Sequence, residues 1–219
     1  MENIENLIET LVTIFTVESG AIKVLLMRRG EDPYKGYWML PSAYAQLDKS
    51  LELTASECVV KRTGLPDLSL LQDRVYSSVD RKPDHRVIAV NYIGLVDTTT
   101  VFLKQEQREE YSIAWFDVTQ LPKLAFDHEV VIQQAKSALK TILSHSENLR
   151  LLFPSDFALP EVQRVYEIIL EKQLDRRNFR KKFMNYHLIE ATGENTEGHN
   201  GRPAKLYRFK ENTKEFILF

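Results

Sequence analysis

The chain has 219 residues, and its 29 lysines and arginines nearly balance its 31 aspartates and glutamates, giving a formal net charge of −2. Hydrophobic residues make up 43% and charged residues 27%, as in ordinary globular proteins, which disfavours a disordered, collagen-like or coiled-coil chain. The single cysteine, Cys58, can form no internal disulfide, and neither a signal-peptide pattern nor a membrane-spanning apolar run is present, so we expect a cytoplasmic protein with no membrane partner.

The first half of the chain has the pattern of strands. Alternating apolar residues predict a hairpin around a turn at 18–20, and a polar break at 28–33 follows it. A polar loop is expected after Pro41. The stretch 86–96 is too apolar for an exposed edge strand. The expected strands or extended segments span residues 11–17, 22–27, 36–41, 73–79, 86–96 and 111–116.

Two helices are expected in the same half. Residues 51–63 place apolar side chains four positions apart, and Gly64 follows as a stop signal. Asp127 is a candidate N-cap for a second helix that continues to about residue 145 and closes the first domain. The next stretch, 149–157, is apolar, which indicates a short connector rather than a flexible linker.

The last part of the chain has a different pattern. A helix from Leu159 is followed by a turn, a second helix over 175–188 and two β segments around the loop 193–203. Asp175 can cap the second helix. These elements predict a small second domain.

Charge is unevenly distributed between the two parts. Residues 161–219 carry 12 basic and 9 acidic residues, whereas residues 1–160 carry 17 and 22, so the net charges are +3 and −5. Within 176–210, nine basic residues face only three acidic ones. The near-neutral total therefore conceals a basic segment, which is typical of a surface that binds nucleic acid.

The second tail helix has two unlike sides. Phe179, Phe183 and Leu188 fall on one side of a helical wheel, and Arg177 and Lys181 fall on the other. Such a helix, preceded by another helix and followed by a hairpin, has the layout of a winged helix-turn-helix whose cations neutralise phosphates at a major groove. A solvated amphipathic helix without a partner is the plainer alternative. The residues expected to bind DNA are Arg176, Arg177, Asn178, Arg180, Lys181, Arg202 and Lys205.

Short motifs in both parts carry a family resemblance. They are Trp38-Met39-Leu40-Pro41, Thr63-Gly64-Leu65 and Phe126-Asp127-His128 in the front, and the segments 175–182 and 201–207 in the tail. The chain thereby resembles the Nudix-fold transcriptional regulators of bacterial NAD or pentose-sugar genes. The resemblance implies an α+β protein: a Nudix-like α/β/α sandwich with a mixed sheet over residues 1–148, followed by a winged helix-turn-helix domain over residues 149–219.

The chain departs from the pattern of active Nudix enzymes, G-x5-E-x7-R-E-U-x-E-E-x-G-U. In that pattern, glutamates one helical turn apart bind a divalent cation that activates water against a diphosphate. Aligning the last two positions on Gly64 and Leu65 puts Lys61 and Arg62 at the two metal-binding glutamates, and Ala43, Lys49, Glu57 and Cys58 at the other defined positions. Residues 58–65 contain no carboxylate. We therefore expect no catalytic residues, no metal site and no cofactor.

A cleft without a metal can still bind a small molecule and report its occupancy to the tail. The resemblance implies an effector that is a sugar, a sugar phosphate or an ADP-ribose-like molecule. The segments Asp80-Arg81-Lys82-Pro83 and Arg86-Val87 resemble the ligand-side loop of these regulators. From the strand ends and loops that face the cleft in that family, the resemblance implies that the effector is bound by Arg28, Tyr44, Asp80, Arg81 and Arg86. As plainer alternatives, the arginines could be solvated or ion-paired, and Asp80 could cap a turn.

Three functions compete. The leading hypothesis is an effector-responsive transcriptional regulator that binds a palindromic operator on double-stranded DNA as a homodimer, because a lone winged helix reads few base pairs. The alternative is a Nudix hydrolase that cleaves a nucleoside diphosphate derivative with Mg²⁺, which the carboxylate-poor helix disfavours. A third hypothesis, that the tail docks a protein, leaves its basic segment without an acidic counterpart in this chain.

Overall fold

A computed structural model describes residues 7–18, 21–96, 112–145, 150, 153, 156–196 and 203–210. The chain divides into two compact units, Met1–Ser137 and Ala138–Phe219, called here the front unit and the rear unit. The division falls inside a helix, whereas the boundary expected from the sequence lies after residue 148. Within the described ranges, no helix is both long and apolar enough to cross a membrane.

The front unit is built on a seven-stranded mixed sheet with the order β3-β2-β1-β6-β5, in which β4 also pairs with β1 and β7 with β2. The strands are β1 (Leu7–Glu18), β2 (Ala21–Arg28), β3 (Trp38–Met39), β4 (Ser42–Tyr44), β5 (Leu70–Tyr76), β6 (Val87–Leu95) and β7 (Ile113–Asp117). Only the pairing of β1 with β6 is parallel among these strands. The predicted mixed sheet is therefore confirmed.

Strand β1 is the central strand, and it is buried over most of its length because strands pair on both of its sides. One side pairs with β6, from Leu7 opposite Val87 onward. The other side pairs first with β4 and then with β2. This register sets Glu9 opposite Tyr44, and both residues belong to the site described below.

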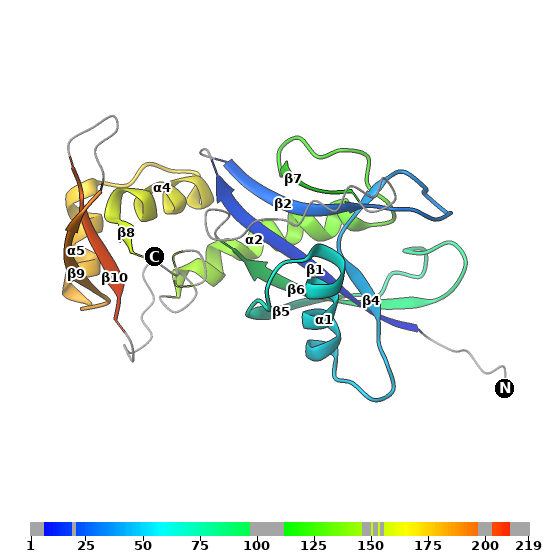
Figure 1. The fold of residues 1–219 in the computed structure, drawn as a ribbon. Helices are drawn as coiled ribbons and strands as arrows, with labels where there is room; N and C mark the ends of the chain where they lie inside the picture. Colours follow the sequence, from blue (N-terminus) through cyan, green and yellow to red (C-terminus); the bar gives the residue numbers. More distant parts are fainter. Residues whose placement is uncertain are drawn as a thin grey trace. The chain divides into compact units, whose positions relative to one another are not determined.

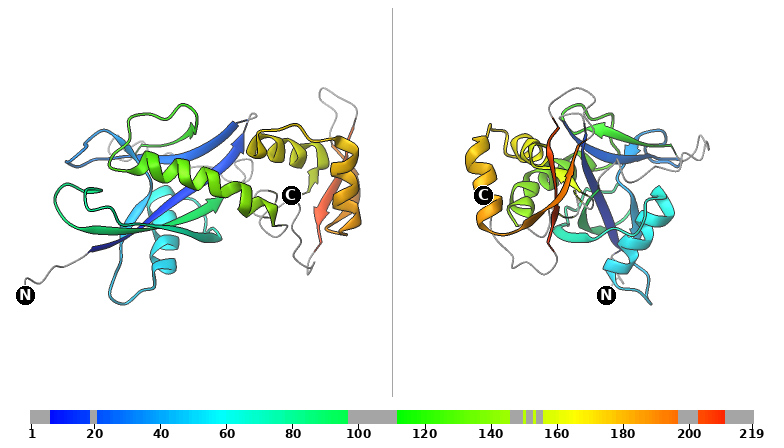
Figure 2. Two further views of the ribbon diagram at one scale, coloured as in Figure 1. Left: turned by 180° about the vertical axis from the view of Figure 1, so that it is seen from behind. Right: turned by 60° about the vertical axis from the view of Figure 1, so that its left-hand side comes forward.

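Helices α1 (Leu51–Thr63) and α2 (His128–Ser144) lie on opposite faces of the sheet (Figures 1 and 2). The hydroxyl of Ser50 caps the start of α1 by accepting a hydrogen bond from the amide of Leu53. The helix ends at Gly64, whose φ of 69° lies in the left-handed region that favours glycine. The stop signal predicted at Gly64 is thus confirmed.

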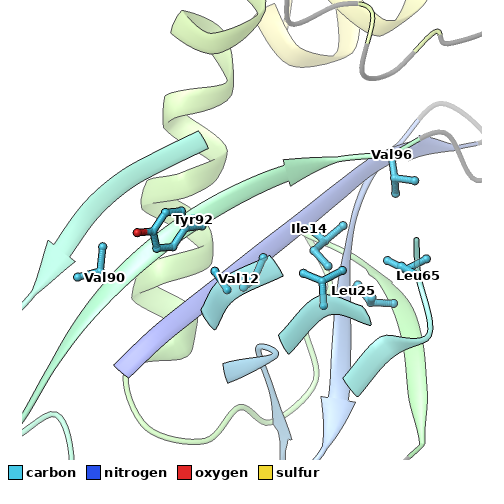
Figure 3. Close-up of a cluster of buried hydrophobic side chains, with 9 residues drawn as sticks. Val12, Ile14, Leu25, Leu65, Val90, Tyr92 and Val96 are labelled. Atoms are coloured by element: carbon cyan, nitrogen blue, oxygen red, sulfur yellow. The ribbon is translucent and has the colours of Figure 1, made fainter. Parts of the chain in front are cut away.

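Aliphatic side chains and one tyrosine fill the space between α1 and the sheet (Figure 3). They come from β1, β2, β6, α1 and the segments that follow α1 and β6, and they are Val12, Ile14, Leu25, Ala55, Val59, Leu65, Val90, Tyr92 and Val96. On the other face, α2 buries Val131, Ile132 and Ala135. Burial on both faces explains why β1 and β6 are so apolar in sequence.

The rear unit has the element order of a winged helix. Its elements are β8 (Phe157–Ala158), α4 (Leu159–Leu170), α5 (Arg176–Asn185), β9 (Ile189–Asn195) and β10 (Lys205–Phe209). The strands form an antiparallel sheet in the order β8-β10-β9. Three buried rings hold the helices together: the ring centroid of Phe179 lies 5.6 Å from that of Tyr166 and 4.7 Å from that of Phe183.

Several expectations about elements were wrong in detail. The strand expected over 73–79 is β5, which spans Leu70–Tyr76 instead. The predicted polar loop after Pro41 contains β4, because Ser42–Tyr44 finds a pairing partner in the distant β1. The predicted connector 149–157 contributes Phe157 to β8, because that residue pairs with β10. Helix α5 ends at Asn185 instead of residue 188, because His187 adopts a left-handed conformation with a φ of 52°. Leu188 lies outside the helix, just before β9, and is nevertheless buried.

Candidate functional site

The front unit contains a cavity of about 820 Å³, within the size range of sites for small molecules. Its wall is formed by the end of β2, by β4, by the loops 29–33 and 82–85 and by the last turn of α1. Glu9 and Phe126 complete it. Segments far apart in the sequence therefore meet here, and none of them forms the cavity alone.

Two of the five predicted effector-binding residues line this cavity. Arg28, at the end of β2, is exposed and donates from Nε to the carbonyl of Gly36 at 3.4 Å. Tyr44, at the end of β4, has its hydroxyl 3.3 Å from Nε2 of His85. Both side chains could therefore reach a ligand in the cavity.

The cavity wall also contains two cations and a ring that were not among the predicted effector-binding residues. Nζ of Lys82 donates to Glu9 at 2.8 Å and lies 4.7 Å from the ring centroid of Phe126. The guanidinium of Arg29 lies 5.0 Å from the same centroid, and its Nε donates to the carbonyl of Pro33 at 2.6 Å. Cations stacked on an aromatic ring are held in place without losing their charge. In the sequence, Arg29 and Lys82 directly follow the predicted Arg28 and Arg81. This adjacency is the sequence signal from which they could have been predicted.

Arg81 does not line the cavity. Its side chain is 1% exposed, and its guanidinium donates to both carboxylate oxygens of Asp127 at 3.1 Å and to Glu9 at 3.1 Å. Burial raises the pKa of Glu9, but the charge of Lys82 and the hydrogen bonds from Lys82 and Arg81 are among the effects that outweigh burial and hold that pKa below its ordinary value. Arg81 therefore joins β1 to the start of α2, and the expectation that it contacts an effector is not supported by its position.

Asp80 and Arg86 also lie off the cavity wall. Asp80 is exposed and accepts a hydrogen bond from the hydroxyl of Ser78 within its own turn. Arg86 is half-buried just before β6, and its Nη1 has no hydrogen-bond partner among the described residues. The turn-capping alternative fits Asp80 better than a contact with a ligand does.

The residues of α1 do not fit the divalent cation that the Nudix fold implies. Glu57 accepts hydrogen bonds from Lys49 at 2.8 Å and from Lys61, and these bonds lower its pKa to about 2. Glu52 accepts a hydrogen bond from the hydroxyl of Tyr92 at 3.3 Å. In the ranges that the structure describes, no three His, Cys, Asp or Glu side chains are grouped to hold a metal ion.

Helix α5 presents a basic face in the rear unit. Asp175 caps the helix, as predicted, by accepting a hydrogen bond from the amide of Asn178 at 2.8 Å. Phe179 and Phe183 are buried. The exposed side chains of the helix include Arg176, Arg177, Asn178, Arg180 and Lys181, and Lys205 is exposed at the start of β10. Most of the predicted DNA-binding residues are thus brought to one helix, and Arg202 lies outside the described residues.

Arg180 differs from the other cations of α5. Its Nη2 donates to the hydroxyl of Tyr207 at 3.4 Å, which ties the flank of the helix to β10. Arg177 and Lys181 lie one turn apart on the side away from the two phenylalanines. They are therefore the best placed of the set to meet a phosphate backbone.

Known proteins resemble the chain in both units. Residues 150–209 match the family described as the NrtR DNA-binding winged helix domain. An ADPR responsive transcriptional repressor, NtrR of Acinetobacter baylyi, is 32% identical over 202 residues, covering 90% of this chain and 80% of that protein. The front half also resembles an ADP-ribose pyrophosphatase of Methanocaldococcus jannaschii, 36% identical over 112 residues, or 51% of this chain and 64% of that one.

Solved structures resemble both the whole chain and its front part. NrtR of Shewanella oneidensis complexed with a 27mer DNA has a TM-score of 0.84 at 27% identity, covering 96% of this chain and 98% of that one. The NUDIX domain of the same protein complexed with ADP ribose has a TM-score of 0.54 at 28% identity, covering 62% and 89%. The fold and its two sites define a DNA-binding transcriptional regulator that joins a Nudix domain to a winged helix. The chain belongs to the NrtR family of these regulators.

Proposed function

We propose that this regulator binds a palindromic operator as a homodimer through α5 and the β9–β10 strand pair, and that an ADP-ribose-like effector in the front cavity controls this binding. The observation that carries the proposal is the exposed basic face of α5, which lies opposite the buried Phe179 and Phe183. Cations on an exposed helix face neutralise phosphates, while the aromatic face anchors the helix. We assign the protein to the cytoplasm, where operator DNA would be available.

We assign the predicted residues as follows. Arg177 and Lys181 contact phosphates, and Asn178 lies on a flank from which a base edge is harder to reach. Arg176, Arg180 and Lys205 add charge on and beside the helix, and Arg202, which lies outside the described residues, is a further proposed contact. Two-fold symmetry then places two such helices about one helical turn of DNA apart. Light scattering on the purified chain would test the dimer, and a monomer in the presence of operator would contradict it.

The DNA contact can be tested by fluorescence anisotropy with a labelled fragment from upstream of the protein's own gene cluster. We expect Arg177→Ala with Lys181→Ala to weaken binding and to flatten its salt dependence, by about 0.9 in log–log slope for each phosphate that the variant no longer neutralises. Replacing Lys35 and Lys123, two exposed lysines of the front unit, removes the same charge elsewhere and should leave the slope unchanged. Equal slopes in all three proteins would show that α5 is not the DNA-binding face.

The effector proposal draws on the cavity and on the relatives. Arg28, Arg29 and Lys82 supply positive charge that suits a diphosphate, and Tyr44 and Phe126 supply rings. One relative is named ADPR responsive, and one similar structure holds ADP ribose. Calorimetric titration with ADP-ribose, ribose 5-phosphate and ribose would separate the three effector classes. We expect ADP-ribose to bind tightest, because it alone of the three carries both a diphosphate for the cations and a base for the rings of the cavity wall.

A hydrolase remains the second candidate, because the front half resembles an ADP-ribose pyrophosphatase. Hydrolysis at the diphosphate would release AMP and ribose 5-phosphate in equal amounts. We propose that this chain does not catalyse the reaction, since Lys61 and Arg62 stand where the enzyme pattern has metal-binding glutamates. Chromatography after incubation of the protein with ADP-ribose and Mg²⁺ tests this, and AMP formed in proportion to the amount of protein would establish the hydrolase instead.

A further inference from the structure

Arg62 is an unengaged cation in the wall of the front cavity. It lies in the last turn of α1, its side chain is exposed, and it lines the cavity. Within the residues that the structure describes, no hydrogen bond or ion pair holds its guanidinium. The other cations of the wall are all engaged: Arg28 and Arg29 donate to main-chain carbonyls and Lys82 donates to Glu9. Arg62 is therefore the cation most available to an incoming anion.

The adjacent Lys61 provides a direct contrast. Both residues occupy positions where the Nudix hydrolase pattern has metal-binding glutamates, and both lie in the last turn of α1. Lys61, however, pairs with Glu57 and does not line the cavity. A cation at a helix C-terminus is favourable in any case, but that effect acts on both residues alike. Only Arg62 combines this position with a place in the cavity wall.

The charge of the cavity wall is mixed. Four acidic residues, Glu9, Glu31, Asp32 and Asp84, also line it. The charge of Glu9 is compensated by Arg81 and Lys82, whose nitrogens lie 3.1 and 2.8 Å from its oxygens. A diphosphate is therefore favoured only where the cations concentrate, which makes the orientation of the ligand depend on individual arginines.

Building on the proposed ADP-ribose-like effector, we propose that the guanidinium of Arg62 binds the effector's diphosphate directly, in the place where a hydrolase holds its metal ion. A guanidinium can donate two parallel hydrogen bonds to phosphate oxygens and keeps its charge at every physiological pH. It cannot ionise a bound water as a metal does. Arg62 thus binds the diphosphate but generates no nucleophile. The effector is therefore not hydrolysed and persists as a signal.

Calorimetry on the full chain with ADP-ribose, in EDTA and then in millimolar Mg²⁺, tests the proposal. We expect the same Kd in both buffers. Arg62→Ala should weaken binding roughly ten- to one-hundredfold, the loss typical of a hydrogen bond to a charged group, and Arg62→Lys should fall between it and the wild type. Lys61→Ala is the matched control and should stay within about twofold. Because both side chains are exposed, both variants should fold, and thermal unfolding verifies this.

The outcomes separate the two proposals. ADP-ribose binding that requires Mg²⁺, or that is as tight in Arg62→Ala as in the wild type, overturns the role of Arg62 and leaves the effector intact. Equal losses in Arg62→Ala and Lys61→Ala would indicate a general charge effect and overturn it too. If the wild type binds no ADP-ribose in either buffer, the proposed effector fails, and the assignment of Arg62 fails with it.

Discussion

Arg81 contacts the wall of the cavity without lining the cavity itself. Its partners, Glu9 and Asp127, lie at the start of β1 and immediately before α2, and Glu9 is one of the lining residues. A buried ion pair adds little net stability when it is complete, because both charges lose their hydration. Removing one member, however, leaves a buried charge without compensation.

We predict that Arg81→Ala destabilises the front unit by about 3–5 kcal/mol, the cost typical of breaking a buried ion pair. The free energy of unfolding in urea measures the effect. Asp80→Ala is the neighbouring control: its side chain is exposed, so its effect should stay within about 0.5 kcal/mol. Similar losses of unfolding free energy in the two variants would mean that the ion pairs of Arg81 with Glu9 and Asp127 do not stabilise the front unit.

His128 should make the stability depend on pH. Its Nδ1 accepts a hydrogen bond from the amide of Leu40 at 3.0 Å, and complete burial lowers the pKa of its ring from 6.5 to about 4. Between these values the unfolded chain binds a proton that the folded chain excludes. Stability is therefore full above about pH 6.5 and falls as the pH drops towards 4.

The expected loss from His128 between pH 7 and pH 5 is about 2 kcal/mol. Urea unfolding at the two pH values measures it, with His128→Asn as the comparison, because an amide can still accept from Leu40 but does not titrate. Every other residue is the same in both proteins, so the difference between their pH slopes isolates position 128. An unchanged pH slope in the variant would show that another group titrates.

At the scale of elements, α5 depends on its first turn. Its helix interior buries only Phe179 and Phe183, and four unpaired amides at its start need acceptors. We predict that Asp175→Ala lowers the free energy of unfolding of the rear unit by about 1 kcal/mol, whereas Asp175→Ser stays within a few tenths, because serine can also cap. Thermal unfolding by circular dichroism checks this. If the serine variant were as unstable as the alanine variant, the negative charge of Asp175 and not its capping hydrogen bond would stabilise the helix.

Elements whose signals are local could be predicted from the sequence. Gly64 and Asp175 are stop and cap residues that act within one turn, and the structure has both as expected. Asp127 correctly marked the start of α2, yet its carboxylate binds Arg81 instead of capping the helix. The difference arises because a cap depends on neighbours in the sequence, while an ion pair depends on the folded chain.

The site could be predicted only in part for the same reason. Arg28 and Tyr44 are the last residues of β2 and β4, and both line the cavity. Arg81 has the same kind of sequence context, but its side chain is buried in an ion pair with Glu9, which lies 72 positions away in the sequence. The cationic face of α5, by contrast, could be predicted from the sequence, because helical periodicity alone places Arg177 and Phe179 on opposite sides of the helix.

At the scale of the whole molecule, effector and DNA must affect each other equally. If ADP-ribose changes the operator Kd by some factor, operator must change the ADP-ribose Kd by that same factor, and couplings of this kind are typically about 5- to 150-fold. Anisotropy with and without saturating ADP-ribose gives one factor, and calorimetry with and without operator gives the other. ADP-ribose that binds but leaves the operator Kd unchanged would contradict a sensing role.

The salt bridge between Lys49 and Glu57 determines which substitutions could restore the hydrolase pattern in this chain. The hydrolase pattern has glutamate and arginine at these two positions, so this chain keeps a pair with its signs exchanged, 2.8 Å apart. Lys49→Glu alone would bring two carboxylates together, and Glu57→Arg alone would set a cation between Lys49 and Lys61. Each single substitution towards the hydrolase pattern thus places like charges side by side, so both positions would have to change together to restore an ion pair of the hydrolase type.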